Sequence, residues 1–120
     1  MCVALRHTYS NAGVQLLLDG VAESTGYTGT LFILFYSKRC PMCRDVISWW
    51  HKLVRNYKGY AVFLALPYNK DTRRLFDGFA VSYVPALIVV KDGIVIKRIE
   101  PIRSRKDLET AIIENLILVP

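Results

Sequence analysis

Apolar runs and segments of helical periodicity alternate along this 120-residue chain. The run Leu31–Tyr36 is apolar at every position, which is typical of a strand that is covered on both faces in the middle of a sheet. Similar runs predict a second buried strand at Tyr60–Leu66, a third strand at Ala86–Val90 and a fourth at Ile94–Ile99. With an edge strand expected at Cys2–Leu5, the sequence predicts a central sheet of four to five strands.

Between these runs, apolar residues recur at steps of three and four, which is the spacing of one face of a helix. The clearest case starts at Pro41, where Val46, Trp50 and Leu53 share one face, and Gly59 ends the helix. Strands and helices that alternate in this way indicate an α/β protein with helices on both faces of the sheet. Three more helices are predicted: one from Ser10 or Asn11 to about Glu23, one over Asp71–Phe79, and one that Ser104 caps and that turns Leu108, Ala111, Ile112 and Leu116 inward.

Composition indicates a single domain over residues 1–120, because 52% hydrophobic residues supply a core and no linker or repeat interrupts the chain. Lys91-Asp92-Gly93 is predicted to join the last two strands as a tight hairpin. The longest apolar run, Leu31–Tyr36, is far shorter than the roughly 20 residues of a transmembrane helix. The N-terminus lacks the basic and apolar segments of a signal peptide, so we expect a cytoplasmic protein.

The formal net charge of +6 raises the question of an acidic partner. The Lys and Arg residues are scattered over several segments. Proteins that bind nucleic acid concentrate such residues on one stripe or motif. We therefore expect solvated basic faces and no nucleic-acid partner.

Two of the three cysteines, Cys40 and Cys43, form a Cys-x-x-Cys motif at a predicted helix start, directly after the first buried strand. Two intervening residues at a helix start place the two sulfurs within bonding reach. Cys40 lies where the unpaired N–H groups of the helix stabilise an anion, and Lys38, Arg39 and Arg44 add positive charge. Cys40 is therefore predicted to be the nucleophile.

Cys43 lies three residues before Val46 and seven before Trp50, so helical geometry turns it towards the apolar face. It is predicted to be the shielded, resolving thiol. The implied reaction is attack by Cys40 on a substrate disulfide, followed by resolution of the mixed disulfide by Cys43. Met42 is expected to be exposed beside the reactive sulfur, where its flexible thioether accepts varied substrate side chains.

The Cys-x-x-Cys spacing also supplies half of many zinc sites. A zinc site would recruit Cys2 with His7 or His51, yet no second Cys-x-x-Cys exists and His51 falls on the polar helix face. The position of the motif between a buried strand and a helix favours redox chemistry. A protein-binding module with structural or zinc-bound cysteines is the alternative to an enzyme.

From Leu31 to the C-terminus the chain resembles the thioredoxin family. Three landmarks carry the resemblance: a buried strand that runs into Cys40-Pro41-Met42-Cys43, Val84-Pro85 before the third strand, and Lys91-Asp92-Gly93 before the last strand and closing helix. The resemblance implies a thioredoxin-like fold, with a mixed four- to five-stranded sheet between helices. It also implies a thiol–disulfide oxidoreductase, either a protein disulfide reductase or an oxidase or isomerase, whose only redox group is the Cys40–Cys43 disulfide, with no bound cofactor. Its expected partners are proteins with disulfides or thiols and an electron donor like thioredoxin reductase.

The resemblance further implies that Pro85 follows a cis peptide bond and lies opposite the cysteine pair. In the family, the backbone of the residue that matches Val84 pairs with an extended substrate segment. The proline that matches Pro85 keeps another metal-binding side chain away from the thiols. Val84 and Pro85 are therefore expected to bind substrate, and Tyr83 either lines the same groove or packs against its neighbours.

The sequence departs from the family's usual pattern in three features. The buried acid that assists the resolving thiol aligns with Leu34, the tryptophan before the first cysteine aligns with Arg39, and Gly-Pro is replaced by Pro41-Met42. Without a carboxylate at Leu34, deprotonation of Cys43 depends on water or another group, which slows resolution of the mixed disulfide. Arg39 is expected to favour the Cys40 thiolate and to shift the couple towards a more oxidising potential.

The Pro-x pair between the cysteines is similar to that of glutaredoxins and of some disulfide oxidases. Glutaredoxins carry a glycine pair and an acidic residue after the last strands to hold glutathione, and Ile99–Ile102 does not match that pattern. A glutathione-dependent reductase is therefore the less favoured enzyme alternative.

Overall fold

The computed structural model describes residues 29–116 of the chain, and these residues form four strands and three helices. The strands are β1 (Thr30–Tyr36), β2 (Val62–Pro67), β3 (Ala86–Lys91) and β4 (Ile94–Ile99), and the helices are α2 (Pro41–Tyr57), α3 (Arg73–Gly78) and α4 (Arg105–Asn115). The predicted strand at Cys2–Leu5 and the predicted helix that ends near Glu23 lie outside the described residues. No described helix is both long and apolar enough to cross a membrane.

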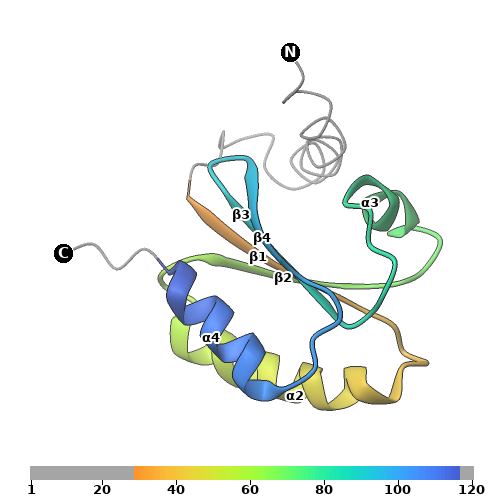
Figure 1. The fold of residues 1–120 in the computed structure, drawn as a ribbon, viewed down its shortest axis with the longest axis horizontal. Helices are drawn as coiled ribbons and strands as arrows, with labels where there is room; N and C mark the ends of the chain where they lie inside the picture. The colour runs from red at the N-terminus through yellow and green to blue at the C-terminus, as the bar shows by residue number, and fades with distance from the viewer. Residues whose placement is uncertain (1–28, 117–120) are drawn as a thin grey trace.

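The four strands form one mixed sheet in the order β2-β1-β3-β4 (Figure 1). β1 runs parallel to β2 and antiparallel to β3, and β3 runs antiparallel to β4. The parallel pair requires a crossover connection, which contains α2. The hairpin predicted at Lys91–Gly93 joins β3 to β4, and Asp92 and Gly93 take the positive φ values of 50° and 84° that such a turn needs.

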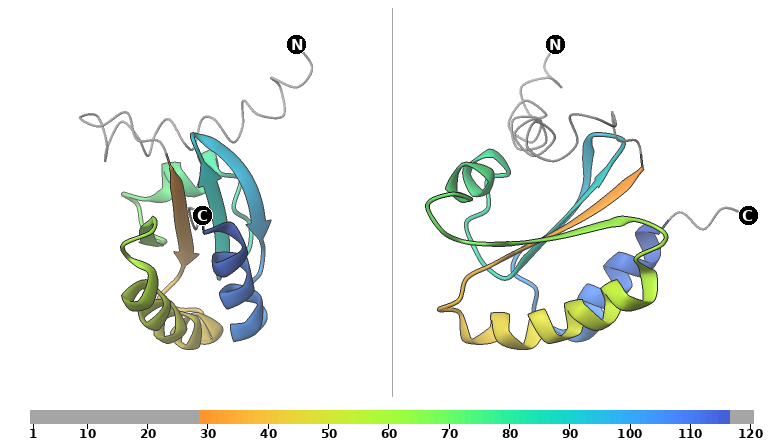
Figure 2. Two further views of the ribbon diagram at one scale, coloured as in Figure 1. Left: turned by 90° about the vertical axis from the view of Figure 1, so that its left-hand side faces the viewer. Right: turned by 180° about the vertical axis from the view of Figure 1, so that it is seen from behind.

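Helices cover both faces of the sheet, with α2 and α4 on one face and α3 on the other (Figures 1 and 2). The side chains of β1 alternate between these two layers. Phe32 and Leu34 belong to the core formed with α2 and α4, whereas Ile33 and Phe35 belong to the core formed with α3. All four side chains are fully buried, so β1 is the covered central strand that its apolar run predicts. The layers confirm the predicted α/β fold class.

The second strand differs from its prediction in both position and burial. It spans Val62–Pro67 instead of Tyr60–Leu66, and Tyr60 is exposed. The expectation of a buried strand is wrong, because Val62 and Ala65 are also exposed. Among the described strands β2 lies at the edge of the sheet and pairs only with β1, which leaves its side chains with less cover.

α3 begins two residues later than the sequence pattern predicts. Asn69 Oδ1 accepts the backbone N–H groups of Asp71 at 2.8 Å and Thr72 at 3.0 Å. These local hydrogen bonds commit the backbone to a turn, so the helix starts only at Arg73.

α4 begins where predicted, because Ser104 caps it. Ser104 Oγ accepts the backbone N–H of Asp107 at 3.1 Å. Trp50 of α2 is buried in the core that α4 also covers, as its place on the apolar stripe predicts. The same core contains all four of the α4-side residues predicted to point inward, namely Leu108, Ala111, Ile112 and Leu116.

Candidate active site

The directions of the strands bring four chain segments to the same end of the sheet. β1 and β2 are parallel and their C-terminal ends lie there, while the antiparallel β3 begins there and β4 ends there. The register fixes the meeting point, since Tyr36 pairs with Pro67 and Phe35 pairs with Ala86. The loop after β1, which leads to the cysteine motif, therefore lies beside the segment that precedes β3.

Cys40 and Cys43 form a disulfide at the start of α2, with their Cα atoms 5.2 Å apart. Cys40 is the N-cap residue of the helix, and its Sγ accepts the backbone N–H of Cys43 at 3.1 Å. The positive end of a helix stabilises a thiolate at this position, and the first turn contains no acidic residue to oppose it. The site thus joins a disulfide to an environment that favours one of its sulfurs as an anion.

The two cysteines differ in their access to solvent. Cys43 is only 1% exposed and is buried with Val46 and Trp50 on the core side of α2. Cys40 is half-buried. An attacking thiol must reach its substrate whereas a resolving thiol need only reach its partner, so the arrangement supports the order of attack predicted from the sequence.

Val84 and Pro85 lie beside the disulfide, and the peptide bond between them is cis, as expected. The Sγ atom of Cys40 lies 3.9 Å from the carbonyl oxygen of Val84. Pro85 is buried, and its own carbonyl accepts the N–H of Ile102 at 2.7 Å. Val84 precedes β3 and lies outside the described strand pairing, so its backbone faces the Cys40 sulfur without being part of the sheet.

The remaining predicted residues take different positions. Pro41 is the first residue of α2, as predicted. Arg39 is exposed; its backbone N–H donates to Ser37 Oγ at 3.2 Å, and its guanidinium forms no hydrogen bond or ion pair with residues 29–116. The expectation that Met42 is exposed is wrong, because this side chain is half-buried against the core beneath α2. Tyr83 is 66% exposed, and it lines neither the hollow beside Val84 nor the hollow beside Arg39.

Sequence reasoning missed Glu100 and Arg98, which hold the segment that leads to Val84. Glu100 Oε2 accepts the backbone N–H groups of Ser82 and Tyr83, the latter at 2.8 Å. Arg98 donates to Glu100 Oε1 at 3.0 Å and to two backbone carbonyls in the loop after α3. The end of β4 is thereby tied to the loop that presents Val84 to the disulfide.

These contacts also decide the charge of Glu100. Burial acts to raise the pKa of Glu100, but hydrogen bonds from Tyr83, Ser82 and Arg98, with the charge of Arg98, hold this pKa below its ordinary value of 4.5. The one signal in the sequence was the spacing of Arg98 and Glu100, since residues two apart on a strand share a face. That signal does not reveal the partner loop, because Tyr83 lies 17 residues earlier in the chain.

Two adjoining hollows, which we call the active-site groove, lie along the loop that leads to Cys40. They share Tyr68 and Ser37, and the Ser37 carbonyl accepts the N–H of Cys40 at 3.2 Å. The first hollow, of about 410 Å³, is lined by Ser37, Tyr68, Phe76, Asp77, Val81, Ser82 and Val84. The second, of about 400 Å³, is lined by Ser37, Lys38, Arg39 and Tyr68.

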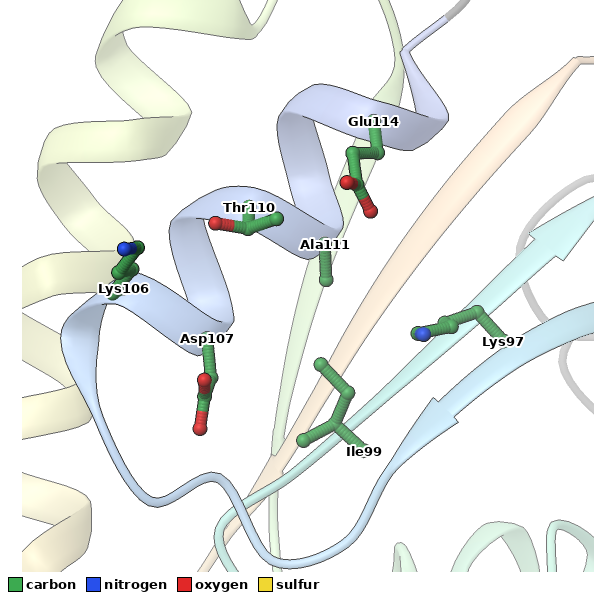
Figure 3. Close-up of a pocket in the computed structure, with 7 residues that line it drawn as sticks. All are labelled: Lys97, Ile99, Lys106, Asp107, Thr110, Ala111 and Glu114. Atoms are coloured by element: carbon green, nitrogen blue, oxygen red, sulfur yellow. The ribbon is translucent and has the colours of Figure 1, made fainter.

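A third hollow, of about 420 Å³, lies between β4 and α4 (Figure 3). None of its lining residues belongs to the cysteine motif or to the loop before β3. Its two lysines and two acidic residues offset each other in charge. The lining residues are Lys97 and Ile99 of β4 and Lys106, Asp107, Thr110, Ala111 and Glu114 of α4.

The zinc alternative draws partly on residues outside the described range. Cys2 and His7 lie outside the described residues, and His51 is exposed on α2. Within residues 29–116 no three or more His, Cys, Asp and Glu side chains are grouped so as to hold a metal ion.

The site combines a half-buried and a buried cysteine at a helix start with a cis-proline where the strands of a mixed sheet end. This combination defines a dithiol–disulfide site of the thioredoxin type. The family model described as Thioredoxin matches residues 22–114, well over half of the chain. The chain therefore belongs to the thioredoxin family. A search of curated protein sequences found no significant match.

Several solved structures share the fold. The germline-specific thioredoxin Deadhead from Drosophila melanogaster is 18% identical with a TM-score of 0.67, over 78% of this chain and 85% of that one. Thioredoxin-2 of the malaria parasite is 23% identical with a TM-score of 0.64, over 72% of this chain and 82% of that one. A structure from a study of yeast mitochondrial 1-Cys peroxiredoxin and the glutathione/thioredoxin systems is 21% identical with a TM-score of 0.63. The match covers 74% of this chain and 81% of that one. At these identities the likeness shows the fold.

Proposed function

We propose that this protein is a protein thiol–disulfide oxidoreductase that works through a reversible Cys40–Cys43 dithiol/disulfide and needs no further cofactor. One observation carries the proposal: the Cys40 sulfur caps α2, accepts the Cys43 N–H at 3.1 Å and lies 3.9 Å from the Val84 carbonyl. Membership of the thioredoxin family supports this general class of chemistry.

The reaction begins with the reduced protein. The Cys40 thiolate attacks one sulfur of a substrate disulfide, the substrate S–S bond breaks, and one substrate thiol leaves as a mixed disulfide forms. Cys43 then loses its proton and attacks Cys40 Sγ, which releases the second substrate thiol. Two electrons and two protons pass from the dithiol to the substrate, and the protein is left oxidised. A protein electron donor related to thioredoxin reductase then restores the dithiol.

Val84 and Pro85 are proposed to dock the substrate. The backbone of Val84 lies outside the described sheet and within 3.9 Å of the attacking sulfur. An extended substrate segment that pairs with this backbone places its disulfide next to Cys40, because main-chain hydrogen bonds fix the path of the segment. The Glu100 carboxylate, which holds the preceding loop, keeps that docking backbone in place.

Two departures from the family's usual sequence, at Leu34 and Arg39, affect the rate of resolution and the reduction potential. Leu34 is fully buried in the core beneath α2, where it provides no group to accept the Cys43 proton. Resolution by Cys43 is therefore proposed to be slow relative to attack. The exposed charge of Arg39, next to Cys40, stabilises the thiolate of the reduced form, so the couple is proposed to be more oxidising than that of a typical thioredoxin.

The test is reduction of a disulfide peptide by the full chain with dithiothreitol as electron source, with bound metal measured on the same sample. The Cys40→Ser variant is expected to lose at least about 10³-fold in rate, because it lacks the attacking sulfur. The matched variant Ser48→Ala, on the exposed face of α2, is expected to keep its rate. A slow wild-type rate that Cys40→Ser does not change would contradict the enzyme proposal, and so would stoichiometric zinc. Either result would favour the alternative of a protein-binding module.

A further inference from the structure

One end of the active-site groove carries positive charge that no side chain from residues 29 to 116 neutralises. Lys38 and Arg39 are both exposed, and both line the hollow of about 400 Å³ that they share with Ser37 and Tyr68. Neither of them forms an ion pair with any residue from 29 to 116. Within the described part of the chain, no acidic side chain lines this hollow.

The hollow is formed by Tyr68 and by the three residues that immediately precede Cys40 in the chain. Arg39 immediately precedes Cys40, and the Ser37 carbonyl accepts the Cys40 N–H at 3.2 Å. A substrate whose disulfide lies at Cys40 therefore places a neighbouring residue at this end of the groove.

Tyr68 forms a fixed wall of the same hollow. Its backbone N–H donates to the Tyr36 carbonyl at 2.8 Å, which ties it to the end of β1. Its ring packs edge-on against Phe76, with the ring centroids 4.9 Å apart. Because the residue is still 52% exposed, it offers surface to a bound segment without having to move.

The two ends of the groove differ in chemistry. The other hollow contains the apolar side chains of Phe76, Val81 and Val84, together with the single acidic residue Asp77. Positive charge is thus confined to the Lys38 and Arg39 end. A substrate segment that lies along the groove meets an apolar end and a basic end.

We propose that the hollow lined by Ser37, Lys38, Arg39 and Tyr68 binds the carboxylate side chain of an Asp or Glu residue that lies next to the disulfide of a polypeptide substrate. This inference rests on the proposed oxidoreductase function. Two unpaired cations attract a carboxylate and repel a lysine, both in the bound state and during encounter. Exposed ion pairs are weak, so the expected preference is about two- to fivefold in rate.

The test uses three disulfide peptides that are identical except for Glu, Gln or Lys next to one cysteine. Each is mixed with the fully reduced protein at low ionic strength, and the second-order rate of peptide reduction is measured in a single turnover. The expected order is Glu before Gln before Lys, and added salt should bring the three rates together. Because all three peptides meet the same Cys40 thiolate, the ratio of rates reports the groove and not the reactivity of the sulfur.

A pair of matched variants locates the preference. Lys38→Gln with Arg39→Gln removes two positive charges from the groove and should bring the Glu to Lys ratio close to one. Lys97→Gln with Lys106→Gln removes the same charge from the hollow between β4 and α4 and should keep the wild-type ratio (Figure 3).

Two results would overturn the carboxylate site and leave the oxidoreductase function intact. One is equal reduction of all three peptides by the wild-type protein at low salt, and the other is an unchanged Glu to Lys ratio in the Lys38→Gln, Arg39→Gln variant. If the reduced protein reduces none of the peptides while dithiothreitol reduces all three, the proposed function itself fails, and the inference fails with it.

Discussion

The N-termini of α2 and α4 share one capping geometry, but the capping atom is a sulfur in α2 and a hydroxyl oxygen in α4. At α4, Ser104 Oγ accepts the N–H of Asp107 at 3.1 Å, and at α2, Cys40 Sγ accepts the N–H of Cys43 at the same distance. In both helices the side chain of the N-cap residue satisfies a backbone donor three residues later, which the helix itself leaves unpaired.

The surroundings of the two caps separate structure from chemistry. The first turn of α4 contains Asp107, whose negative charge suits the positive end of a helix, while the first turn of α2 contains no acid. No acidic side chain in the first turn of α2 therefore offsets the positive end of the helix dipole, which stabilises negative charge on the sulfur of Cys40. The same local motif is thus a structural cap when its atom is a hydroxyl oxygen, and the proposed reactive centre when its atom is a sulfur with a second sulfur within reach.

The largest expected effect separates the two sulfurs at the reactive cap. In Cys43→Ser the Cys40 thiolate still attacks but nothing resolves the product, so a mixed disulfide with a disulfide substrate should accumulate to near stoichiometry. In Cys40→Ser the serine should still cap α2, and no mixed disulfide should form. Mass spectrometry of the intact adducts measures both, and equal trapping by the two variants would contradict the assigned roles.

The next effect concerns the support of the docking loop. Glu100→Ala removes charge-assisted hydrogen bonds to Ser82, Tyr83 and Arg98, so the free energy of unfolding should fall by about 1.5–3 kcal/mol. If Glu100 positions the docking backbone, KM for a disulfide peptide should rise several-fold while kcat changes little. Denaturant titration and steady-state kinetics measure these effects.

Glu114→Ala is the control for Glu100, because Glu114 is an exposed acid at the hollow between β4 and α4. It should leave both the stability and KM near the wild-type values. A loss of stability in Glu100→Ala without a change in KM would limit Glu100 to a structural role.

A smaller effect is expected at the structural cap. Ser104→Ala removes the hydrogen bond to Asp107 and should lower the free energy of unfolding by about 1 kcal/mol. The rate of peptide reduction per folded molecule should stay unchanged, because α4 contributes no residue to the active-site groove. Urea titration and single-turnover kinetics on the same sample check both halves, and a reduced rate would show that the two helix starts are coupled.

The smallest effect appears only in acid. Since the folded protein holds the pKa of Glu100 below 4.5, its contacts contribute fully above that pH and are lost as the pH falls through the lowered value. Between pH 7 and pH 3 the wild type should therefore lose more stability than Glu100→Gln, which has no carboxyl to protonate at this position. Parallel losses in the two proteins would show that Glu100 contributes no such dependence.

The parts that the sequence predicts well are those with local causes. The cap at Ser104, the hairpin at Lys91–Gly93 and the cysteine pair at the start of α2 each depend on residues a few positions apart. The exposure of β2 and the contacts of Glu100 depend on which segments become neighbours, and no short pattern records that. The partial burial of Met42 is unpredicted for the same reason, because its place in the motif does not reveal the core beside it.

The central claim is that Cys40 and Cys43 form a reversible couple whose reduced form the start of α2 stabilises. The most direct test is the reduction potential of this couple, measured by equilibration with glutathione and dithiothreitol buffers. The account predicts a single two-electron transition with a midpoint more positive than thioredoxin's value of about −270 mV. A midpoint at or below that value would contradict the stabilised thiolate, and the absence of any disulfide at all buffer ratios would contradict the reversible couple itself.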